Sequence, residues 1–308
     1  MGAKSIIGSL VRAVKRPLYR RPRIVMTLLC RDEEDIVGYN IAYHLAQGVD
    51  FIVAMDNGSA DRTPAMLERF AKLGKLHLIH EPRHIHDQST WVTGMARMAA
   101  TRFDADWVIN NDADEFWSAA GTTLRAALAA VPADVPSLSV PRIDMLPPQA
   151  VDAKFYEAMT LHMATREAID GGRPLPKACH RAFADIHIAD GNHFASRGGA
   201  RLPESTGHPL RIFHFPIRSP AQLERKIRQG VAALEANPRL PASTGRHWRK
   251  LHHDYLTTGR LEKYYLEQAP GAERRAHRCR RSRIGAPAFR IFVKLLRENR
   301  AKTDRVEI

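Results

Sequence analysis

Residues 107–117, with the sequence WVINNDADEFW, place three carboxylates directly behind an apolar run. Asp112, Asp114 and Glu115 fall within four positions. Two aspartates one residue apart can bind a divalent metal, because carboxylate oxygens suit Mg²⁺ and Mn²⁺ and both ions are commonly shared with substrate phosphates. The same aspartates could instead cap a following helix or lie solvated in a loop. The stretch therefore raises the hypothesis of a metal site at the end of a buried strand.

Short apolar runs alternate with helical patterns over the first half of the chain. Strands are predicted at 23–30, 51–57, 75–82, 107–112 and 136–141, and helices at 36–46, 63–73, 88–103 and 122–131. This alternation is typical of βαβ units, so it predicts an α/β fold with a doubly wound, mostly parallel sheet and helices on both faces.

Acidic residues follow three of the predicted strands. They are Asp32 and Glu33, then Asp56 and Asp61, then Asp112 and Asp114. In open α/β sheets, ligands bind beyond the carboxyl ends of the strands. The acidic residues therefore lie where this fold class binds its ligands.

The second half of the chain is organised differently. A loop-rich stretch begins near residue 145, short strands are predicted at 179–190 and 210–215, and helices at 219–236, 246–257, 259–268 and 287–299. We expect three parts: a basic amphipathic segment at 1–22, an α/β domain that carries the acidic strand ends at 23–218, and a basic helical extension at 219–308.

The net charge of +14 is concentrated at the two ends of the chain. Residues 1–23 carry +7 and residues 271–308 carry +8, which leaves 24–270 near −1. A nearly neutral central part disfavours specific nucleic-acid binding. The apolar face within residues 6–14 is typical of an interfacial helix, and the arginine run 274–283 suits anionic lipid or polysaccharide, although a nucleic-acid arm or a solvated tail gives the same pattern.

Cysteine usage and hydropathy limit the cellular setting. Cys30, Cys179 and Cys279 are too widely spaced for a CxxC zinc site or a disulfide framework, which favours reduced thiols. No apolar run approaches the roughly 18 residues of a membrane span, and the N-terminus lacks a secretory pattern. We expect a cytoplasmic protein, with peripheral contact to anionic lipid at the inner face of the membrane as a further hypothesis.

Several motifs in order resemble family 2 glycosyltransferases of the GT-A fold. The segment LLCRDEEDIVGYNIAYHLAQGVDFIVAMDNGSADRT and the later DADEF carry the resemblance over about residues 23–118. A weaker likeness continues through GNHF at 191–194 and HFPIRSPAQLERKIRQG at 214–230. The resemblance implies transfer of a sugar from a nucleotide-diphosphate sugar, most often a UDP-sugar, to a glycan or lipid-linked acceptor in cell-surface polysaccharide biosynthesis, with inversion and with Mn²⁺ or Mg²⁺.

The resemblance also implies roles for particular residues. The nucleotide-binding residues would be Thr27, Arg31, Glu33, Asp56 and Asp112. The metal ligands would be Asp112, Asp114 and His214, with Asp114 the more direct of the two aspartates.

The general base is the least defined part of the expected site. An inverting transferase needs a carboxylate to take the proton from the acceptor hydroxyl. Glu115 and Asp190 are the candidates that we retain, and the sequence leaves Asp144, Asp170 and Asp185 open as well.

Two other classes of function fit part of the pattern. A nucleotidyltransferase acting on sugar phosphates also uses paired carboxylates on a doubly wound sheet, but it would usually carry a glycine-rich loop after the first strand, where Arg31, Asp32 and Glu33 stand here. A non-enzymatic polyanion-binding protein would explain the basic ends but not the acidic strand ends.

Overall fold

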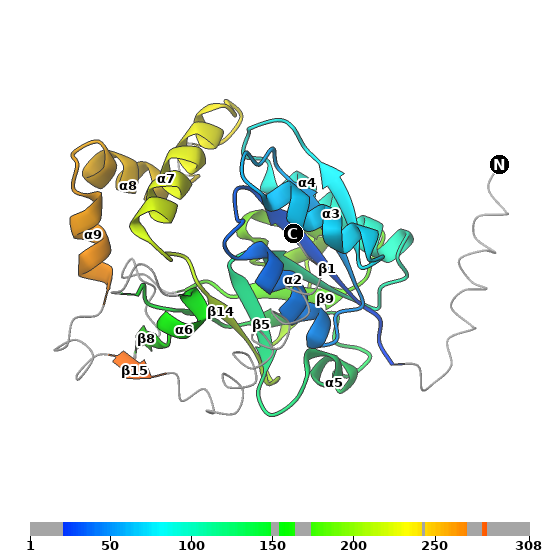
Figure 1. Ribbon diagram of the computed structural model, residues 1–308. Coiled ribbons are helices and arrows are strands. Elements are labelled where there is room, and N and C mark those ends of the chain that lie inside the picture. The colour runs from blue at the N-terminus through cyan, green and yellow to red at the C-terminus, as the bar shows by residue number, and fades with distance from the viewer. Residues whose placement is uncertain (1–20, 149–153, 164–173, 242–243, 270–278, 282–308) are drawn as a thin grey trace.

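The computed structural model describes residues 21–148, 154–163, 174–241, 244–269 and 279–281. The predicted helix at 287–299, nearly all of the basic N-terminal segment and most of the arginine run lie outside these residues. Within them, the chain forms a mixed α/β fold with a large central sheet that is mostly parallel (Figure 1).

The central sheet has seven strands in the described part of the chain, in the order β13-β6-β9-β4-β1-β2-β3. They are β13 (Glu204–Ser205), β6 (Ser137–Val140), β9 (Lys177–Arg181), β4 (Trp107–Asp112), β1 (Ile24–Cys30), β2 (Phe51–Asp56) and β3 (Leu76–His80). Among these strands only β9 runs antiparallel to its neighbours. The predicted doubly wound, mostly parallel sheet is thereby confirmed.

Strand register brings the acidic strand ends to one edge of the sheet. In the parallel pairs of β1, Cys30 lies opposite Asp56 and Leu29 lies opposite Asp112. The residues that follow β1, β2 and β4 are therefore neighbours in space, as the sequence predicted.

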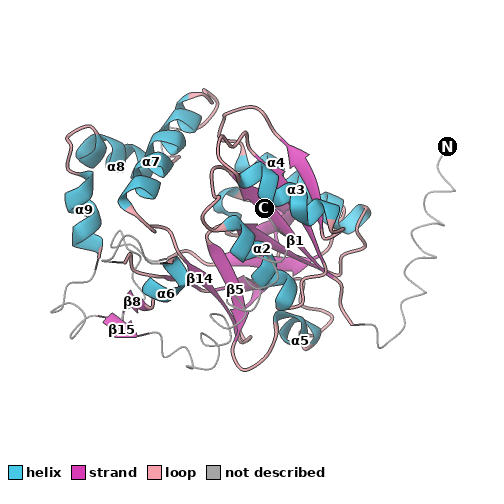
Figure 2. Ribbon diagram, viewed as in Figure 1, coloured by secondary structure: helices cyan, strands magenta, loops and turns pink. Residues whose placement is uncertain are grey.

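Alternating side chains of the central strands supply two separate hydrophobic cores. On one face, Ile24, Met26 and Leu28 pack with helices α2 (Val37–Ala46), α3 (Thr63–Lys72) and α5 (Leu124–Ala129). On the other face, Val25 packs with α4 (Gln88–Thr101). Helices thus cover both faces, and their bounds agree with the predicted ranges to within a few residues (Figure 2).

A second, smaller sheet was missed by the sequence analysis. Strand β5 (Glu115–Ala119) begins immediately after Ala113 and Asp114, which form the turn between β4 and β5 that we call the acidic turn. It pairs with β14 (Leu210–His214), and β14 pairs with β7 (Arg142–Asp144). Its register places His214 opposite both Glu115 and Asp144. This sheet joins the acidic turn to the later histidine.

Buried polar side chains of α2 fix the backbone of the acidic turn. The Asn40 amide donates to the backbone oxygens of Ala113 at 2.9 Å and Glu115 at 2.7 Å. His44 accepts a hydrogen bond from the backbone N–H of Trp117 at 3.1 Å. Helix α2 therefore fixes the backbone of the turn between β4 and β5.

The C-terminal helices form a separate small core beside the sheet domain (Figure 1). These are α7 (Pro220–Glu235), α8 (Arg246–Leu251), a π-helical turn at His252–Leu256 and α9 (Leu261–Gln268). They match the predicted helices at 219–236, 246–257 and 259–268, except that the middle one changes to π-helical geometry. In the described residues, no helix combines the length and apolar character that crossing a membrane requires.

The remaining described elements are short. They comprise helix α6 (Phe155–Ala158), the 3₁₀ turn Asp190–Asn192, and strands β8 (Leu161–Met163), β10 (His187–Ile188), β11 (Ala195–Arg197), β12 (Ala200–Arg201) and β15 (Cys279–Arg281).

Two buried histidines should make the protein sensitive to mild acid. Burial lowers the pKa of His44 and of His180 to about 4 from the ordinary value of 6.5. Between these values the unfolded chain binds protons that the folded protein does not, so the free energy of unfolding falls as the pH is lowered from 6.5 toward 4. Each histidine should cost about 2 kcal/mol between pH 7 and pH 5.

Urea unfolding at pH 7 and pH 5 measures this loss. His44→Gln should reduce the difference between the two pH values, whereas His253→Gln, at a side chain that is 88% exposed, should leave it unchanged. An identical difference in wild type and His44→Gln would contradict the assignment.

Candidate active site

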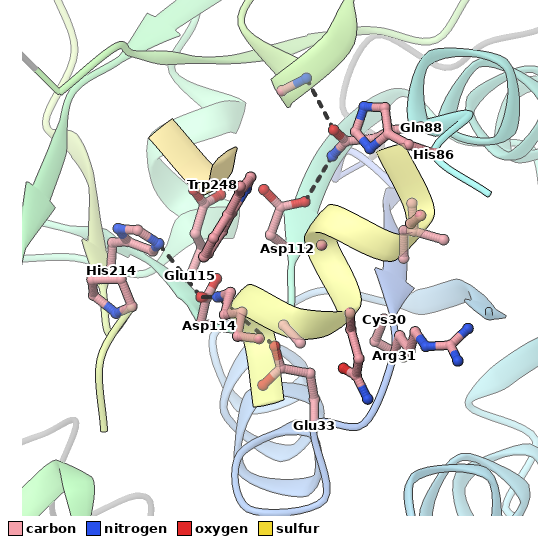
Figure 3. A pocket seen from close by; sticks show the side chains of 18 of the residues that line it. Cys30, Arg31, Glu33, His86, Gln88, Asp112, Asp114, Glu115, His214 and Trp248 are labelled. Atoms are coloured by element: carbon pink, nitrogen blue, oxygen red, sulfur yellow. Dashed lines mark hydrogen bonds and ion pairs between the residues drawn. The ribbon is translucent and has the colours of Figure 1, made fainter. Parts of the chain in front are cut away.

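A cavity of about 670 Å³ opens at the carboxyl ends of β1 and β4. Six of the nine residues that the sequence analysis retained for the site line it: Arg31, Glu33, Asp112, Asp114, Glu115 and His214. Figure 3 shows Glu33, Asp114, Glu115 and His214 close together, whereas Arg31 points away from them. Residues from α7, α8 and α9, including Lys226, Trp248 and Tyr264, line it as well.

Asp112 ends β4 and is held by three side chains. Its Oδ2 atom lies 2.6 Å from Nζ of Lys177. Its Oδ1 atom accepts hydrogen bonds from Gln88 and Asn192, both at 3.2 Å. The carboxylate is therefore fixed in orientation and neutralised by a cation from the antiparallel strand β9.

Asp114 faces His214 across the acidic turn. The distance from Asp114 Oδ2 to His214 Nε2 is 3.5 Å (Figure 3). The other ring nitrogen, Nδ1, lies 2.7 Å from Oδ1 of Asp144. Lys226 of α7 contacts the same Oδ2 atom of Asp114. One carboxylate oxygen is thus shared between an imidazole and an ammonium group.

The charges around Asp114 set its protonation state. Burial alone would raise the pKa of this carboxyl, but Lys226 and His214 hold it well below its ordinary value. The pKa of His214 is raised, because Asp114 and Asp144 outweigh the effect of burial. Asp114 is consequently an ionised carboxylate, which is the form that binds cations.

Glu115 is a buried carboxylate in the wall of the cavity. It is 0% exposed, and its Oε1 atom lies 3.0 Å from Nζ of Lys177 and 3.9 Å from Nη1 of Arg142. Among the described residues, no donor reaches either oxygen with hydrogen-bond geometry. Burial raises the pKa of this carboxyl despite the nearby cations.

Arg218 ties the start of α7 to the loop after β1. Its Nε atom lies 2.6 Å from one oxygen of Asp35, its Nη2 atom lies 2.9 Å from the other, and Nη2 also contacts Glu33. A guanidinium suits this bidentate arrangement because its donors are rigid and planar. The C-terminal helices are thereby fixed to the rim of the cavity.

Three of the predicted site residues do not line the cavity. Thr27 is buried and donates to the side chain of Asn110 at 3.0 Å. Asp56 is 4% exposed and accepts a hydrogen bond from the backbone N–H of Ser59 at 3.3 Å. Asp190 accepts one from the backbone N–H of Ser89 at 3.2 Å.

The surroundings of these three residues differ. Asn57, which follows Asp56, lines the cavity, and so does Gly191, which follows Asp190. The Asp190 carboxylate also lies 3.8 Å from the ring of His86. Of the other carboxylates left open as bases, Asp144 lines the cavity, Asp185 pairs with Arg197 outside it, and Asp170 lies outside the described residues.

Sequence reasoning missed the cations of the site: Lys177, Arg218 and Lys226. Arg218 and Lys226 fall in the segment 214–230 that carries part of the family resemblance. Buried carboxylates require counter-ions, so these two could have been found from that requirement. Lys177 has no comparable signal, because only the folded sheet brings β9 beside Asp112.

The residues around Asp114 fit a divalent metal that shares its coordination with a ligand. Within the described residues, no group of three or more His, Cys, Asp or Glu side chains is arranged to hold an ion on its own. Asp114 and His214 supply one carboxylate and one imidazole, and Asp144 orients the imidazole as such second carboxylates do. Mg²⁺ and Mn²⁺ sites of this kind are usually completed by substrate phosphates and water.

The side-chain contacts of Asp112 differ from those of Asp114 and His214. The two oxygens of Asp112 are already engaged by Lys177, Gln88 and Asn192. The geometry thus groups Asp114 with His214, and Asp112 with a different set of partners.

No family model matches the sequence, and no curated protein matches it. Among solved structures, TarS 1–349 of S. aureus in complex with UDP matches at 14% identity over 82% of this chain and 77% of that one, with a TM-score of 0.38. Glucosyl-3-phosphoglycerate synthase of Mycobacterium tuberculosis, in complex with Mn²⁺, UDP and glucosyl-3-phosphoglycerate, matches at 16% identity over 41% of this chain, with a TM-score of 0.29.

A mycobacterial protein matches at 18% identity over 42% of this chain, also with a TM-score of 0.29. The matches span 46% of the mycobacterial protein and 50% of the synthase, about half of each. What all three share with this chain is similarity of structure at low sequence identity.

The buried pair of Lys177 and Glu115 should be strongly coupled. Lys177→Met removes the cation nearest to Asp112 and Glu115 and leaves only the more distant Arg142 beside Glu115, and breaking a buried pair costs about 3–5 kcal/mol. Adding Glu115→Gln should restore part of the loss, because the uncompensated buried charge is then removed. Urea unfolding of both single variants and the double variant measures the coupling.

A matched control is Lys250→Met. Lys250 pairs with Asp254 at 3.1 Å, but its side chain is 71% exposed. Solvent screens an exposed pair, so the same substitution should have little effect on the free energy of unfolding there. Equal losses at positions 177 and 250 would refute the importance of the buried pair.

Proposed function

We propose that the protein is a metal-dependent glycosyltransferase of the family 2 type. It transfers a sugar from a nucleotide-diphosphate sugar, a UDP-sugar, to a glycan or lipid-linked acceptor with inversion. The observation that carries the proposal is the pairing of Asp114 with His214 in a cavity at the carboxyl ends of β1 and β4. The motif resemblance carried by residues 23–118 supports the same activity.

Asp114 and His214 are the residues that hold the metal in this proposal. A divalent ion there would neutralise the negative charge that grows on the diphosphate as the glycosidic bond breaks. Asp144 keeps the His214 ring oriented through Nδ1, so that Nε2 points to Asp114. The same proposal assigns Asp112, two positions earlier in the motif, to the ribose and the metal, for which it would have to leave its contacts with Lys177, Gln88 and Asn192.

The nucleotide is bound by the residues after β1 and β2. Arg31 and Glu33 line the cavity, whereas Thr27 and Asp56 support it from buried positions in the strands. Arg31 donates to the backbone oxygen of Asn57 at 2.7 Å, which links the two strand ends that form this part of the pocket.

The proposed general base is Glu115, with Asp190 as the second candidate. Glu115 lines the cavity, and burial raises the pKa of its carboxyl. A base with a raised pKa takes the proton of the acceptor hydroxyl more readily. The Asp190 carboxylate lies at the edge of the site and is engaged by Ser89.

The ends of the chain complete the proposal. The basic segments at 1–22 and 271–308 would hold the enzyme at an anionic membrane on the cytoplasmic side, close to a lipid-linked acceptor. The division into a catalytic domain at 23–218 and an extension at 219–308 belongs to the same proposal.

Calorimetry of UDP binding with and without Mn²⁺ tests the proposed function. The wild-type protein should bind UDP far more tightly with Mn²⁺, and Asp114→Asn should lose this metal-dependent part because it removes the charge while keeping the side-chain volume. Circular dichroism checks that the variant folds. Metal-dependent UDP binding of wild-type strength in folded Asp114→Asn would show that the metal assignment is wrong.

Asp56 should act independently of the metal. Its carboxylate accepts a hydrogen bond from the backbone N–H of Ser59 and so fixes the strand end beside Asn57, which lines the cavity. A charged hydrogen bond contributes about 1.5–3 kcal/mol, so Asp56→Asn, which distorts this wall of the pocket, should weaken UDP binding by up to about a hundredfold both with and without Mn²⁺. Asp61→Asn, in the turn after the same strand, is the comparison. Unchanged affinity in Asp56→Asn would reject the role.

A further inference from the structure

Lys226 occupies the position at Asp114 that the proposed metal would need. Its ammonium group contacts Oδ2 of Asp114, the same oxygen that faces Nε2 of His214. It also lies 4.0 Å from Oε1 of Glu33. A cation bound between Asp114 and His214 would therefore meet the lysine at close range, and like charges at that distance repel.

The helix that carries Lys226 is fixed at its start but not at this side chain. Arg218, just before α7, is buried and bound to both oxygens of Asp35. Lys226 lies two turns further along, and its side chain is 26% exposed. A lysine is a point charge on a flexible stem, so it can change partners while the helix stays in place.

Two neighbours of Lys226 on α7 also contact the loop after β1. Gln229 contacts Oδ2 of Asp32, and Arg225 lies 3.5 Å from the backbone oxygen of Asp32. Figure 3 shows this helix, in yellow, passing beside Asp114 and Glu33. A diphosphate bound at the strand ends would lie beneath this face, within reach of a cationic side chain.

We propose that Lys226 exchanges partners when the donor binds. Without nucleotide it neutralises Asp114 and keeps a divalent ion from binding there. With nucleotide it moves to the diphosphate, and Asp114 becomes free for the ion. Metal and nucleotide then bind together rather than separately, which rests on the proposed function and adds a residue that couples its two ligands.

The exchange predicts opposite effects of one substitution in two ligand states. Without nucleotide, Lys226→Met should raise the affinity for Mn²⁺ about tenfold, the scale of one charge-assisted hydrogen bond, because Asp114 loses its competing cation. With UDP present, the same variant should bind UDP and Mn²⁺ about tenfold more weakly, because the diphosphate loses a cationic partner.

Titration of the full-length protein with MnCl₂, followed by the electron paramagnetic resonance of free Mn²⁺, measures the first effect without any turnover. Calorimetry with UDP and Mn²⁺ measures the second. Lys226→Arg keeps the charge and should retain weak Mn²⁺ binding without nucleotide. The matched control is Arg228→Ala on the same helix, where the arginine is 60% exposed and pairs with Glu224.

Two results separate the exchange from the function on which it rests. If wild type binds UDP with Mn²⁺, but neither folded Lys226→Met nor folded Lys226→Gln binds Mn²⁺ more tightly without nucleotide, the exchange is wrong and the proposed function stands. If wild type fails to bind UDP with Mn²⁺, the proposed function and the exchange both fall.

Discussion

The gathering of carboxylates at one edge of the sheet is the constraint on which the rest of the structure depends. Register in a parallel sheet forces Asp112 and the residues after β1 into the same region. Ionised groups removed from water are costly unless a partner of opposite charge compensates them. The compensating cations come from later parts of the chain, so the acidic edge determines how β9 and α7 must pack. The C-terminal half is therefore part of the electrostatic balance of the site.

The cations that satisfy this constraint are not equivalent. Arg218 grips Asp35 through two donors and is buried, which suits a permanent joint. Lys177 is 2% exposed and lies between Asp112 and Glu115, so it stabilises the floor of the cavity. Lys226 is the most exposed of the three and reaches the oxygen nearest His214. The three cations thus differ in role according to side-chain rigidity and burial. Arg218 fixes α7 to the loop after β1, Lys177 stabilises the buried carboxylates, and Lys226 is the one that we propose to change partners.

Local patterns in the sequence predicted what local physics determines. The alternation of strands and helices and the acidic residues after β1, β2 and β4 follow from periodicity and from the fold class. Strand β5 was missed because EFWSA follows the acidic turn with no glycine or proline to mark a new strand. The antiparallel place of β9, and with it the partner of Asp112, could not be predicted because pairing between strands distant in the chain leaves no local signal. Thr27 and Asp56 were expected to line the pocket. Thr27 lies in the middle of β1, away from the strand end, and beside Asp56 it is Asn57 that lines the cavity.

The amide of Asn40 separates the shape of the acidic turn from its chemistry. Its two hydrogen bonds end on the backbone oxygens of Ala113 and Glu115, which every amino acid would present there. The hold of Asn40 on the turn is accordingly independent of which side chains the turn displays. Substitutions at 112, 114 or 115 would leave these two hydrogen bonds available while they change the charges that the pocket presents. In such a scaffold, the side chains that meet the substrate can change during evolution while the support of the backbone by Asn40 is retained.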